Sequence, residues 1–168
     1  MKGTLELYRG NLLDVDCDAV VNAANSSLMG GGGVDGAIHR AAGPELKEAC
    51  RPLAPCPTGE VRVTEGFGLG DRLIFHTVGP VWRGGNEGEA ELLASCYRKC
   101  LDALIERELT SIVFPAISTG AYGFPVNEAA GVAVHECRPY AKKHDIKITL
   151  SAFDQQNATA IEGALESA

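Results

Sequence analysis

Apolar and polar positions along the chain form short strand-like runs that alternate with longer helical stretches. The strand-like runs are brief and mostly apolar, as in residues 19–22 (Ala-Val-Val-Asn), which is typical of strands covered on both faces of a sheet. The helical stretches carry apolar residues at spacings of three and four positions. Strands are expected at residues 4–8, 19–22, 61–64, 73–78, 111–114 and 146–153, and helices at residues 35–42, 45–50, 90–107, 126–142 and 157–166.

This alternation of strands and helices predicts an α/β fold with a mainly parallel sheet and helices on both faces. A length of 168 residues suits one domain, and no repeat, low-complexity tract or linker divides residues 1–168. In sheets of this kind, ligands bind in the crevice beyond the carboxyl ends of the strands. The residues that follow the expected strands are therefore the first candidates for a site.

Two glycine-bearing stretches follow expected strands. Residues 30–33 are four consecutive glycines, and residues 118–123 read Ser-Thr-Gly-Ala-Tyr-Gly. A run of glycines is destabilising unless the backbone must approach a ligand closely, because glycine loses the most conformational freedom on folding. Backbone N–H groups in such turns form a concavity that binds anions. The two stretches predict a phosphate-rich ligand held between them; a flexible surface loop is the alternative for the first stretch.

The glycine run differs from two common nucleotide motifs. A P-loop requires Lys and then Ser or Thr after its last glycine, whereas Val34 and Asp35 stand there. The run does not have the GxGxxG form of a dinucleotide-binding turn, and no serine lies in a GxSxG elbow. The sequence therefore does not favour nucleoside triphosphate hydrolysis or a serine-hydrolase triad.

Asn25 and Asp35 flank the four glycines and are the candidate reactive residues. The Asn25 amide could hold a sugar hydroxyl, and the Asp35 carboxylate could orient a water molecule for attack. Each has a plainer alternative, since Asn25 could only shape a turn and Asp35 could be a helix N-cap or a first-turn acid. His39 lies one helical turn after Asp35, so a catalytic pair is conceivable, but His39 and His76 fit structural roles better.

Two aromatic residues are further candidates. Tyr122 lies between the glycines of the second stretch and could stack on a sugar, with packing inside the loop as the alternative. Phe153 ends the last expected strand and could lie against an adenine face, with core packing as the alternative.

Charge and cysteine usage limit the classes of partner. A formal net charge of -7 does not favour binding to nucleic acid, which depends on Lys and Arg. An anionic small molecule can still be bound by backbone N–H groups. The six cysteines lack CxxC spacing and the four histidines are scattered, so neither disulfides nor a metal site is expected. Cys96 and Cys100 share one face of a helix and are expected to be small buried apolar residues.

No secretory signal and no apolar run of about 20 residues occurs, so no contact with a membrane is expected. We therefore expect a cytoplasmic protein with reduced thiols.

Four segments closely resemble the signature of MacroD-type macrodomains. They are residues 20–25 (Val-Val-Asn-Ala-Ala-Asn), 30–39 (four glycines, then Val-Asp-Gly-Ala-Ile-His), 75–82 (Phe-His-Thr-Val-Gly-Pro-Val-Trp) and 114–123 (Phe-Pro-Ala-Ile-Ser-Thr-Gly-Ala-Tyr-Gly). The resemblance covers essentially the whole chain. It is closest to bacterial O-acetyl-ADP-ribose deacetylases, whose members also resemble mono-ADP-ribosyl hydrolases, and it implies a three-layer α/β/α sandwich around a mixed, mainly parallel sheet.

The resemblance implies ADP-ribose or O-acetyl-ADP-ribose as the ligand, with no metal and no other cofactor. It implies that Asn25 holds the hydroxyls of the distal ribose and that Asp35 orients the attacking water. The glycine run would lie against the distal ribose and diphosphate, the second stretch would wrap the diphosphate, and Phe153 would stack near adenine. The implied ligand-binding residues are Asn11, Leu12, Ala23, Gly32, Gly33, Val34, Ser118, Thr119, Gly120, Ala121, Tyr122 and Phe153.

One position departs from the family pattern. The family has an Asp after the glycine that ends the first strand, and this Asp accepts a hydrogen bond from the adenine amino group. This chain has Asn11 there. The amide oxygen can still accept, but the charge is lost, and charged hydrogen bonds are stronger by roughly 1 kcal/mol. We expect weaker adenine discrimination than in a relative with Asp.

The sequence thus predicts a hydrolase that cleaves an ester at the distal ribose. The substrate would be O-acetyl-ADP-ribose or ADP-ribose on an acidic side chain of a protein, and attack at the ester carbonyl or at the anomeric carbon stays open. The alternative is a reader that binds ADP-ribose on proteins without hydrolysing it. An RNA-linked role is less favoured by the acidic charge, and a monomer is expected.

Overall fold

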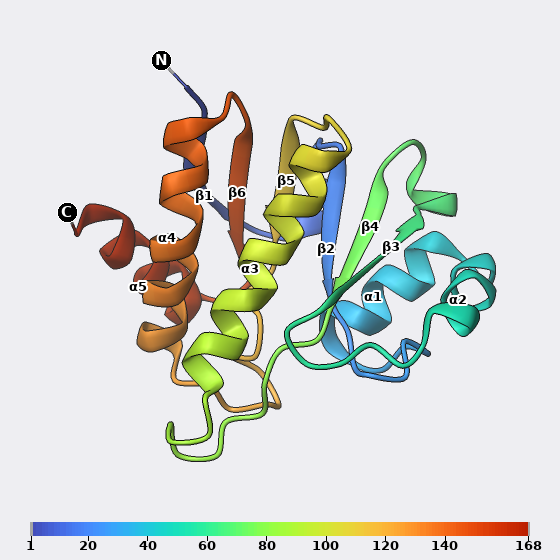
Figure 1. Cartoon of the computed structure of the whole chain (residues 1–168), viewed down its shortest axis with the longest axis horizontal. Coiled ribbons are helices and arrows are strands. Elements are labelled where there is room, and N and C mark those ends of the chain that lie inside the picture. The colour runs from blue at the N-terminus through green and yellow to red at the C-terminus, as the bar shows by residue number, and fades with distance from the viewer. Residues whose placement is uncertain (1, 168) are drawn as a thin grey trace.

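Six strands form one mixed sheet in the computed structural model, which describes residues 2–167 (Figure 1). The strands are β1 (Thr4–Arg9), β2 (Ala19–Ala23), β3 (Val61–Glu65), β4 (Leu73–Thr77), β5 (Ser111–Phe114) and β6 (Lys147–Ala152). Their order across the sheet is β1-β6-β5-β2-β4-β3, and β3 runs antiparallel to β4 while the other pairs are parallel. The predicted mixed, mainly parallel sheet is confirmed.

The helices also follow the prediction. They are α1 (Gly33–Ala42), α2 (Glu45–Cys50), α3 (Glu89–Glu106), α4 (Val126–Lys143) and α5 (Gln155–Glu166), with short 3-10 turns η1 (Leu12–Asp14), η2 (Arg51–Leu53) and η3 (Phe67–Leu69). The ends of the predicted strands and helices lie within two residues of the observed ends. The three 3-10 turns were not predicted.

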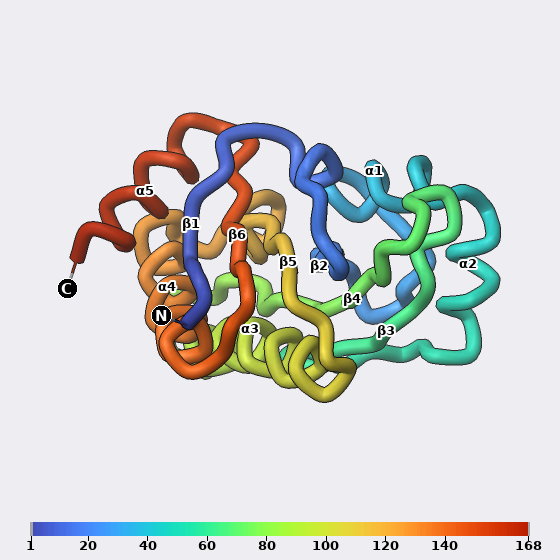
Figure 2. The backbone as a smooth tube through the Cα atoms, turned by 90° about the horizontal axis from the view of Figure 1, so that it is seen from above, coloured from blue at the N-terminus to red at the C-terminus, as the bar shows by residue number. Residues whose placement is uncertain are grey.

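Neighbouring residues on the central strands pack on opposite faces of the sheet. Val21 and Phe75 belong to the core that lies against α3, α4 and α5, whereas Val20 and Ile74 belong to the core that lies against α1 and α2. Figure 2 shows the molecule from above, with α3 and α4 on one side of the sheet and α1 on the other. This is the predicted three-layer α/β/α arrangement, and it explains why the central strands are apolar on both faces.

The carboxyl ends of β1, β2, β4, β5 and β6 lie along one edge of the sheet, at the bottom of Figure 1, because these strands are mutually parallel. The two glycine stretches follow β2 and β5, which are neighbours in the sheet. The segments after β1 and β6 leave from the same edge. The fold therefore brings the predicted site residues to one edge of the molecule.

None of the helices within residues 2–167 is long and apolar enough to cross a bilayer.

Candidate functional site

Asp35 lies in the first turn of α1, and its side chain is almost completely buried. The helix begins at Gly33 with Gly32 as its N-cap, so the alternative that Asp35 caps the helix is wrong. Asp35 Oδ1 instead accepts a hydrogen bond from Asn22 Nδ2 at 2.9 Å, and His39 Nε2 lies 3.5 Å from the same oxygen. Asn22 on the sheet therefore holds this carboxylate, whereas His39 Nε2 is buried without a hydrogen-bond partner among residues 2–167.

The glycine run brings main chain close to that carboxylate. A Cβ on Gly31 would lie 3.4 Å from Asp35 Oδ2 and 3.5 Å from Asn25 Nδ2, so both candidate reactive side chains border the same piece of backbone. A Cβ on Gly36 would lie 2.4 Å from the carbonyl oxygen of Gly31, which explains a glycine inside the helix. Gly33 has φ +58°, a conformation that side chains disfavour.

Asn25 organises the turn that carries the glycines. Its Nδ2 donates to the Gly30 carbonyl oxygen at 3.0 Å, and its Oδ1 accepts from the Ser27 backbone N–H at 3.1 Å and from Ser27 Oγ at 2.6 Å. The plainer alternative, a turn-shaping role, is thus part of what Asn25 does. An amide nitrogen carries two hydrogens, so one remains for a ligand.

A buried group of polar side chains behind Asp35 was missed by the sequence analysis. Asn22 Nδ2 lies 3.1 Å from His76 Nδ1, and His76 Nε2 lies 2.9 Å from Thr64 Oγ1. Asn22 Oδ1 is buried without a hydrogen-bond partner among residues 2–167. Burial, reinforced by nearby His39, lowers the pKa of His76 to about 3, so the imidazole is neutral. Polar residues inside otherwise apolar strands were the available signal.

The loop after β5 is held against the segment after β4. Ser118 is buried with φ +68°, and its Oγ has no hydrogen-bond partner among the described residues. A Cβ on Gly79 would lie 2.1 Å from Ser118 Oγ, so only glycine allows this approach. The Trp82 N–H donates to the Tyr122 carbonyl oxygen at 2.8 Å. Non-glycine residues in this conformation cluster at ligand clamps, which agrees with the predicted role of the loop.

Some of the predicted residues of this loop stabilise its turn, and others are exposed to solvent. Thr119 Oγ1 donates to the Ala116 carbonyl oxygen at 3.0 Å, which closes the turn. Gly120 and Ala121 are exposed at its tip, and Tyr122 is half-buried. The tip is therefore the part of the loop open to a ligand.

Phe153 and Asn11 follow β6 and β1, so they lie at the same edge as Asp35 but at its far end. The Gly10 N–H donates to the Ala152 carbonyl oxygen at 2.9 Å, so the segments after β1 and β6 start side by side. Phe153 is 85% exposed, and the alternative that it packs in the core is wrong. A large exposed aromatic ring next to an amide side chain is suited to binding a flat heterocycle.

Asn11 itself caps the turn η1. Its Oδ1 accepts a hydrogen bond from the Leu13 N–H at 2.9 Å. The side chain of Leu12 is buried in the core against α1 and α2, so only its main chain could contact a ligand. Ala23 ends β2 and is partly exposed.

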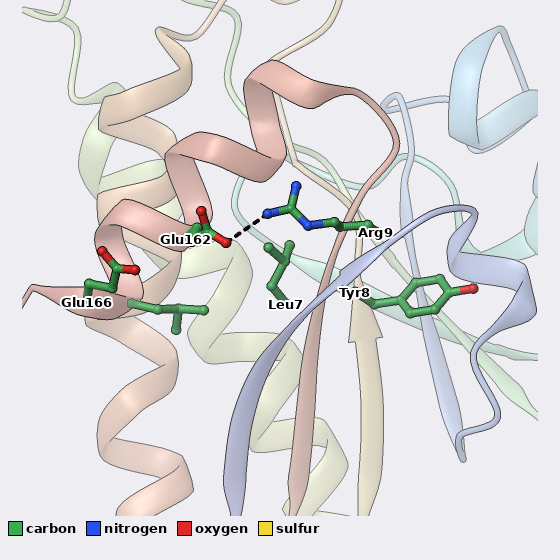
Figure 3. Close-up of a pocket in the computed structure, with 6 residues that line it drawn as sticks. Leu7, Tyr8, Arg9, Glu162 and Glu166 are labelled. Carbon is green, nitrogen blue, oxygen red and sulfur yellow. Dashed lines mark hydrogen bonds and ion pairs between the residues drawn. The ribbon is translucent and has the colours of Figure 1, made fainter.

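A separate open hollow of about 510 Å³ lies between β1 and α5 (Figure 3). Leu7 and Arg9 point toward α5, and an ion pair of 2.8 Å joins Arg9 to Glu162 at the rim, while Tyr8 points away. None of the residues that line this hollow belongs to the group around Asp35. We therefore place the candidate site at the glycine loops and not in this hollow.

Within residues 2–167, no three His, Cys, Asp or Glu side chains are grouped so that they could bind a metal ion. The six cysteines are free thiols, and Cys96 and Cys100 lie in the core as predicted.

A family model described as the Macro domain matches residues 21–133. The chain belongs to the Macro domain family. The macrodomain is 58% identical over 163 residues to a macro domain-containing protein of Chlorobaculum tepidum, with 96% of this chain and 95% of the relative covered. It is 45% identical over 164 residues to a Salmonella gallinarum protein named O-acetyl-ADP-ribose deacetylase, with 94% and 92% covered.

Solved structures agree with the fold. The macrodomain of Oceanobacillus iheyensis with ADP superposes with a TM-score of 0.94 at 42% identity, covering 98% of this chain and 91% of that one. A Trypanosoma brucei macrodomain in complex with ADP-ribose superposes with a TM-score of 0.86 at 40% identity, covering 96% and 68%. The predicted macrodomain resemblance and fold class are confirmed.

Proposed function

We propose that this macrodomain is a MacroD-type hydrolase of ADP-ribose esters. Its substrates would be O-acetyl-ADP-ribose and mono-ADP-ribose on acidic side chains of proteins. The observation that carries the proposal is the buried Asp35 carboxylate, with Oδ1 bound by Asn22 and Oδ2 close to the glycine run. The relative named O-acetyl-ADP-ribose deacetylase and the neighbours with ADP and ADP-ribose support it.

In this proposal the diphosphate lies between the two glycine loops. Gly32 and Gly33 are exposed at the start of α1, where free N–H groups and the helix dipole favour an anion. The exposed tip of the loop after β5, at Gly120 and Ala121, would bind from the neighbouring strand. The adenine would then extend toward Phe153 and the distal ribose toward Asp35. Backbone groups can bind the anion in this way despite the acidic net charge of the chain.

The reaction on O-acetyl-ADP-ribose needs a water oxygen to bond to the acetyl carbonyl carbon. Asp35 Oδ2 would accept a hydrogen bond from that water and turn its lone pair toward the ester. The bond from the carbonyl carbon to the ribose oxygen then breaks. The ribose oxygen leaves as a hydroxyl with one proton of the water, and acetate is released as the other proton passes to solvent. Binding of the nucleotide would hold the ester in place, so that the step becomes effectively intramolecular.

On a glutamate-linked ADP-ribose, water could add to the ester carbonyl or to the anomeric carbon of the ribose. Turnover in ¹⁸O-water distinguishes these routes, because carbonyl attack places the label in the freed glutamate carboxylate and anomeric attack places it in ADP-ribose.

The test is incubation of the protein with O-acetyl-ADP-ribose and, separately, with a glutamate-modified protein, with products followed by mass spectrometry. We expect acetate and ADP-ribose from the first substrate and free ADP-ribose from the second. The double variant Asn25→Ala/Asp35→Ala should lose turnover, and turnover at the unaltered rate would overturn the mechanism. Tight ADP-ribose binding with no turnover of either substrate would instead identify the protein as a reader.

A further inference from the structure

Four buried side chains in contact with one another connect the outermost strand, β3, to Asp35. Thr64 on β3, His76 on β4 and Asn22 on β2 are each buried, and they join Asp35 on α1 through contacts of 2.9, 3.1 and 2.9 Å. The three strands are neighbours, and Asn22 is paired directly with His76 in the parallel register of β2 and β4. The mechanism proposed above uses Asp35 but gives no task to His76 or Thr64.

The hydrogens that these four side chains carry determine which atom donates and which accepts in each contact. The two hydrogens on Asn22 Nδ2 are directed to Asp35 Oδ1 and to His76 Nδ1, so both of these atoms must accept. His76 Nδ1 accepts only when it carries no proton, which places the proton of the neutral imidazole on Nε2. Nε2 lies beside Thr64 Oγ1, which can accept that proton in a hydrogen bond. Each N–H of the Asn22 amide and of the His76 ring thus meets an acceptor.

The surroundings keep His76 in this neutral form. Burial and His39 lower the pKa of His76 to about 3. Asp35 is on the far side of Asn22, and the Cys50 thiol, whose pKa is raised by burial to about 11, lies 3.8 Å from Nε2. Arg62 is the strand partner of His76 on β3, but its guanidinium donates to backbone carbonyl oxygens instead.

We propose that His76 and Thr64 are positioning residues that, through Asn22, decide which oxygen of the Asp35 carboxylate faces the substrate. The inference rests on the proposed function. Neutral His76 orients the Asn22 amide, and the amide binds Oδ1, which leaves Oδ2 directed toward Gly31 and the ligand. If Nδ1 were protonated or removed, it could no longer accept from the Asn22 amide. The amide would then be free to turn, and the Asp35 carboxylate would no longer be held in one orientation.

Three variants test this connection at different points. His76→Leu removes both ring nitrogens, whereas His76→Asn keeps an oxygen acceptor close to the position of Nδ1. Thr64→Val removes the acceptor for Nε2–H without changing side-chain volume much. Thr149→Val makes the same exchange at a buried threonine on β6, outside the connection, and is the matched control.

The readouts are kcat on O-acetyl-ADP-ribose, the Kd of ADP-ribose by calorimetry, and the thermal midpoint. We expect His76→Leu to lower kcat at least about tenfold with Kd nearly unchanged, because misplacing a reactive group mainly affects the chemical step. His76→Asn should recover most of that loss. Thr64→Val should fall between them, and Thr149→Val should keep the kcat of the unaltered protein.

Imidazole ¹⁵N chemical shifts of the unaltered protein report the tautomer of His76 on which the positioning role depends. They should show Nε2 protonated and Nδ1 unprotonated, without titration between pH 5 and 8. A proton on Nδ1 would overturn the inference, as would unchanged kcat in folded His76→Leu. If His76→Leu does not fold, Thr64→Val decides: a kcat equal to that of the unaltered protein overturns the inference.

The failures of the two proposals are distinguishable. An unaltered protein that binds ADP-ribose without turnover overturns the hydrolase and the positioning role together. An unaltered protein that hydrolyses the ester, with His76→Leu and Thr64→Val equally fast, overturns the positioning role alone.

Discussion

The two ends of the candidate site differ in how firmly the protein holds them. At the α1 end, Asp35 is buried and bound by Asn22. At the β6 end, Phe153 is 85% exposed, and the side chain of Asn11 is held by one hydrogen bond, which its Oδ1 accepts from the Leu13 N–H. A group that directs a water molecule must be placed within a fraction of an ångström, whereas a base needs only a flat surface and a polar edge. If the proposed function holds, we expect turnover to depend on the α1 end and affinity on the β6 end.

The largest expected effect is a loss of kcat, without a loss of affinity, when Asp35 at the buried end is changed. Asp35→Asn keeps an oxygen that can accept from Asn22, so the packing persists while the charge is lost. We expect kcat on O-acetyl-ADP-ribose to fall at least about 100-fold, since the carboxylate proposed to orient the attacking water is removed. The Kd of ADP-ribose, measured by calorimetry, should stay within about twofold, because this carboxylate acts mainly in the transition state.

Glu48→Gln removes an exposed carboxylate from the neighbouring helix α2 and should leave both constants unchanged. Parallel loss of binding and turnover in Asp35→Asn would contradict the separation between the two ends.

The second prediction concerns the middle of the site, where the loop after β5 lies against the segment after β4. Gly79→Ala would place a Cβ 2.1 Å from Ser118 Oγ and 2.6 Å from Ile117 Cγ2, so the loop after β5 must move. Overpacking of this kind costs about 2 kcal/mol, and a loss of that size in binding is roughly thirtyfold in Kd. ADP-ribose calorimetry and thermal unfolding measure the two effects.

The matched control is Gly131→Ala in α4, where a Cβ would meet no atom within 4 Å. This exchange should raise stability slightly, since alanine is a better helix former. An unchanged ADP-ribose Kd in Gly79→Ala would show that the loop after β5 does not contribute to binding.

Much of this arrangement follows from local sequence. Strands buried on both faces are continuous apolar runs, so residues 19–23 and 111–114 were recognisable, and glycine–proline pairs marked the ends of other elements. Once the strands were taken as parallel, their carboxyl ends had to share an edge. The candidate site could therefore be located before any long-range contact was known.

The connection behind Asp35 could not be predicted in the same way. Asn22 and His76 are 54 positions apart, and their contact depends on β2 and β4 being neighbours in a particular register. Strand order is not encoded in the periodicity of any one segment, and neither is the reversed direction of β3. The capping role of Asn11 also went unpredicted, because η1 is a single turn without a repeating pattern.

The third prediction tests the exposed end. Phe153→Ala should weaken ADP-ribose binding about tenfold if the ring stacks on adenine, since base stacking on an aromatic side chain is worth roughly 1–3 kcal/mol. The kcat at saturating substrate and the thermal midpoint should not change, because the ring is largely outside the core. Phe153→Trp keeps an aromatic face and should keep the affinity. A change in kcat with unaltered Kd would reverse the comparison between the two ends.

The smallest expected effect is a gain at the same end. Asn11 Oδ1 already accepts from the Leu13 N–H, and Nδ2, at the other end of the amide, can only donate. The exocyclic amine of adenine also donates, and two donors do not pair. Asn11→Asp replaces this nitrogen with a charged acceptor and keeps the cap, because Asp and Asn cap turns about equally well.

We expect the Kd of ADP-ribose to fall about fivefold in Asn11→Asp, which corresponds to roughly 1 kcal/mol. The ratio of IDP to ADP affinity sharpens the test, because hypoxanthine presents a carbonyl oxygen where adenine has its amine. The unaltered protein should bind IDP more tightly than ADP, because Nδ2 can donate to the carbonyl oxygen of hypoxanthine, and Asn11→Asp should favour ADP. An Asn11→Asp variant with neither tighter ADP-ribose binding nor a changed ratio would show that the base does not contact this side chain, and the adenine would then be held by the Phe153 ring alone.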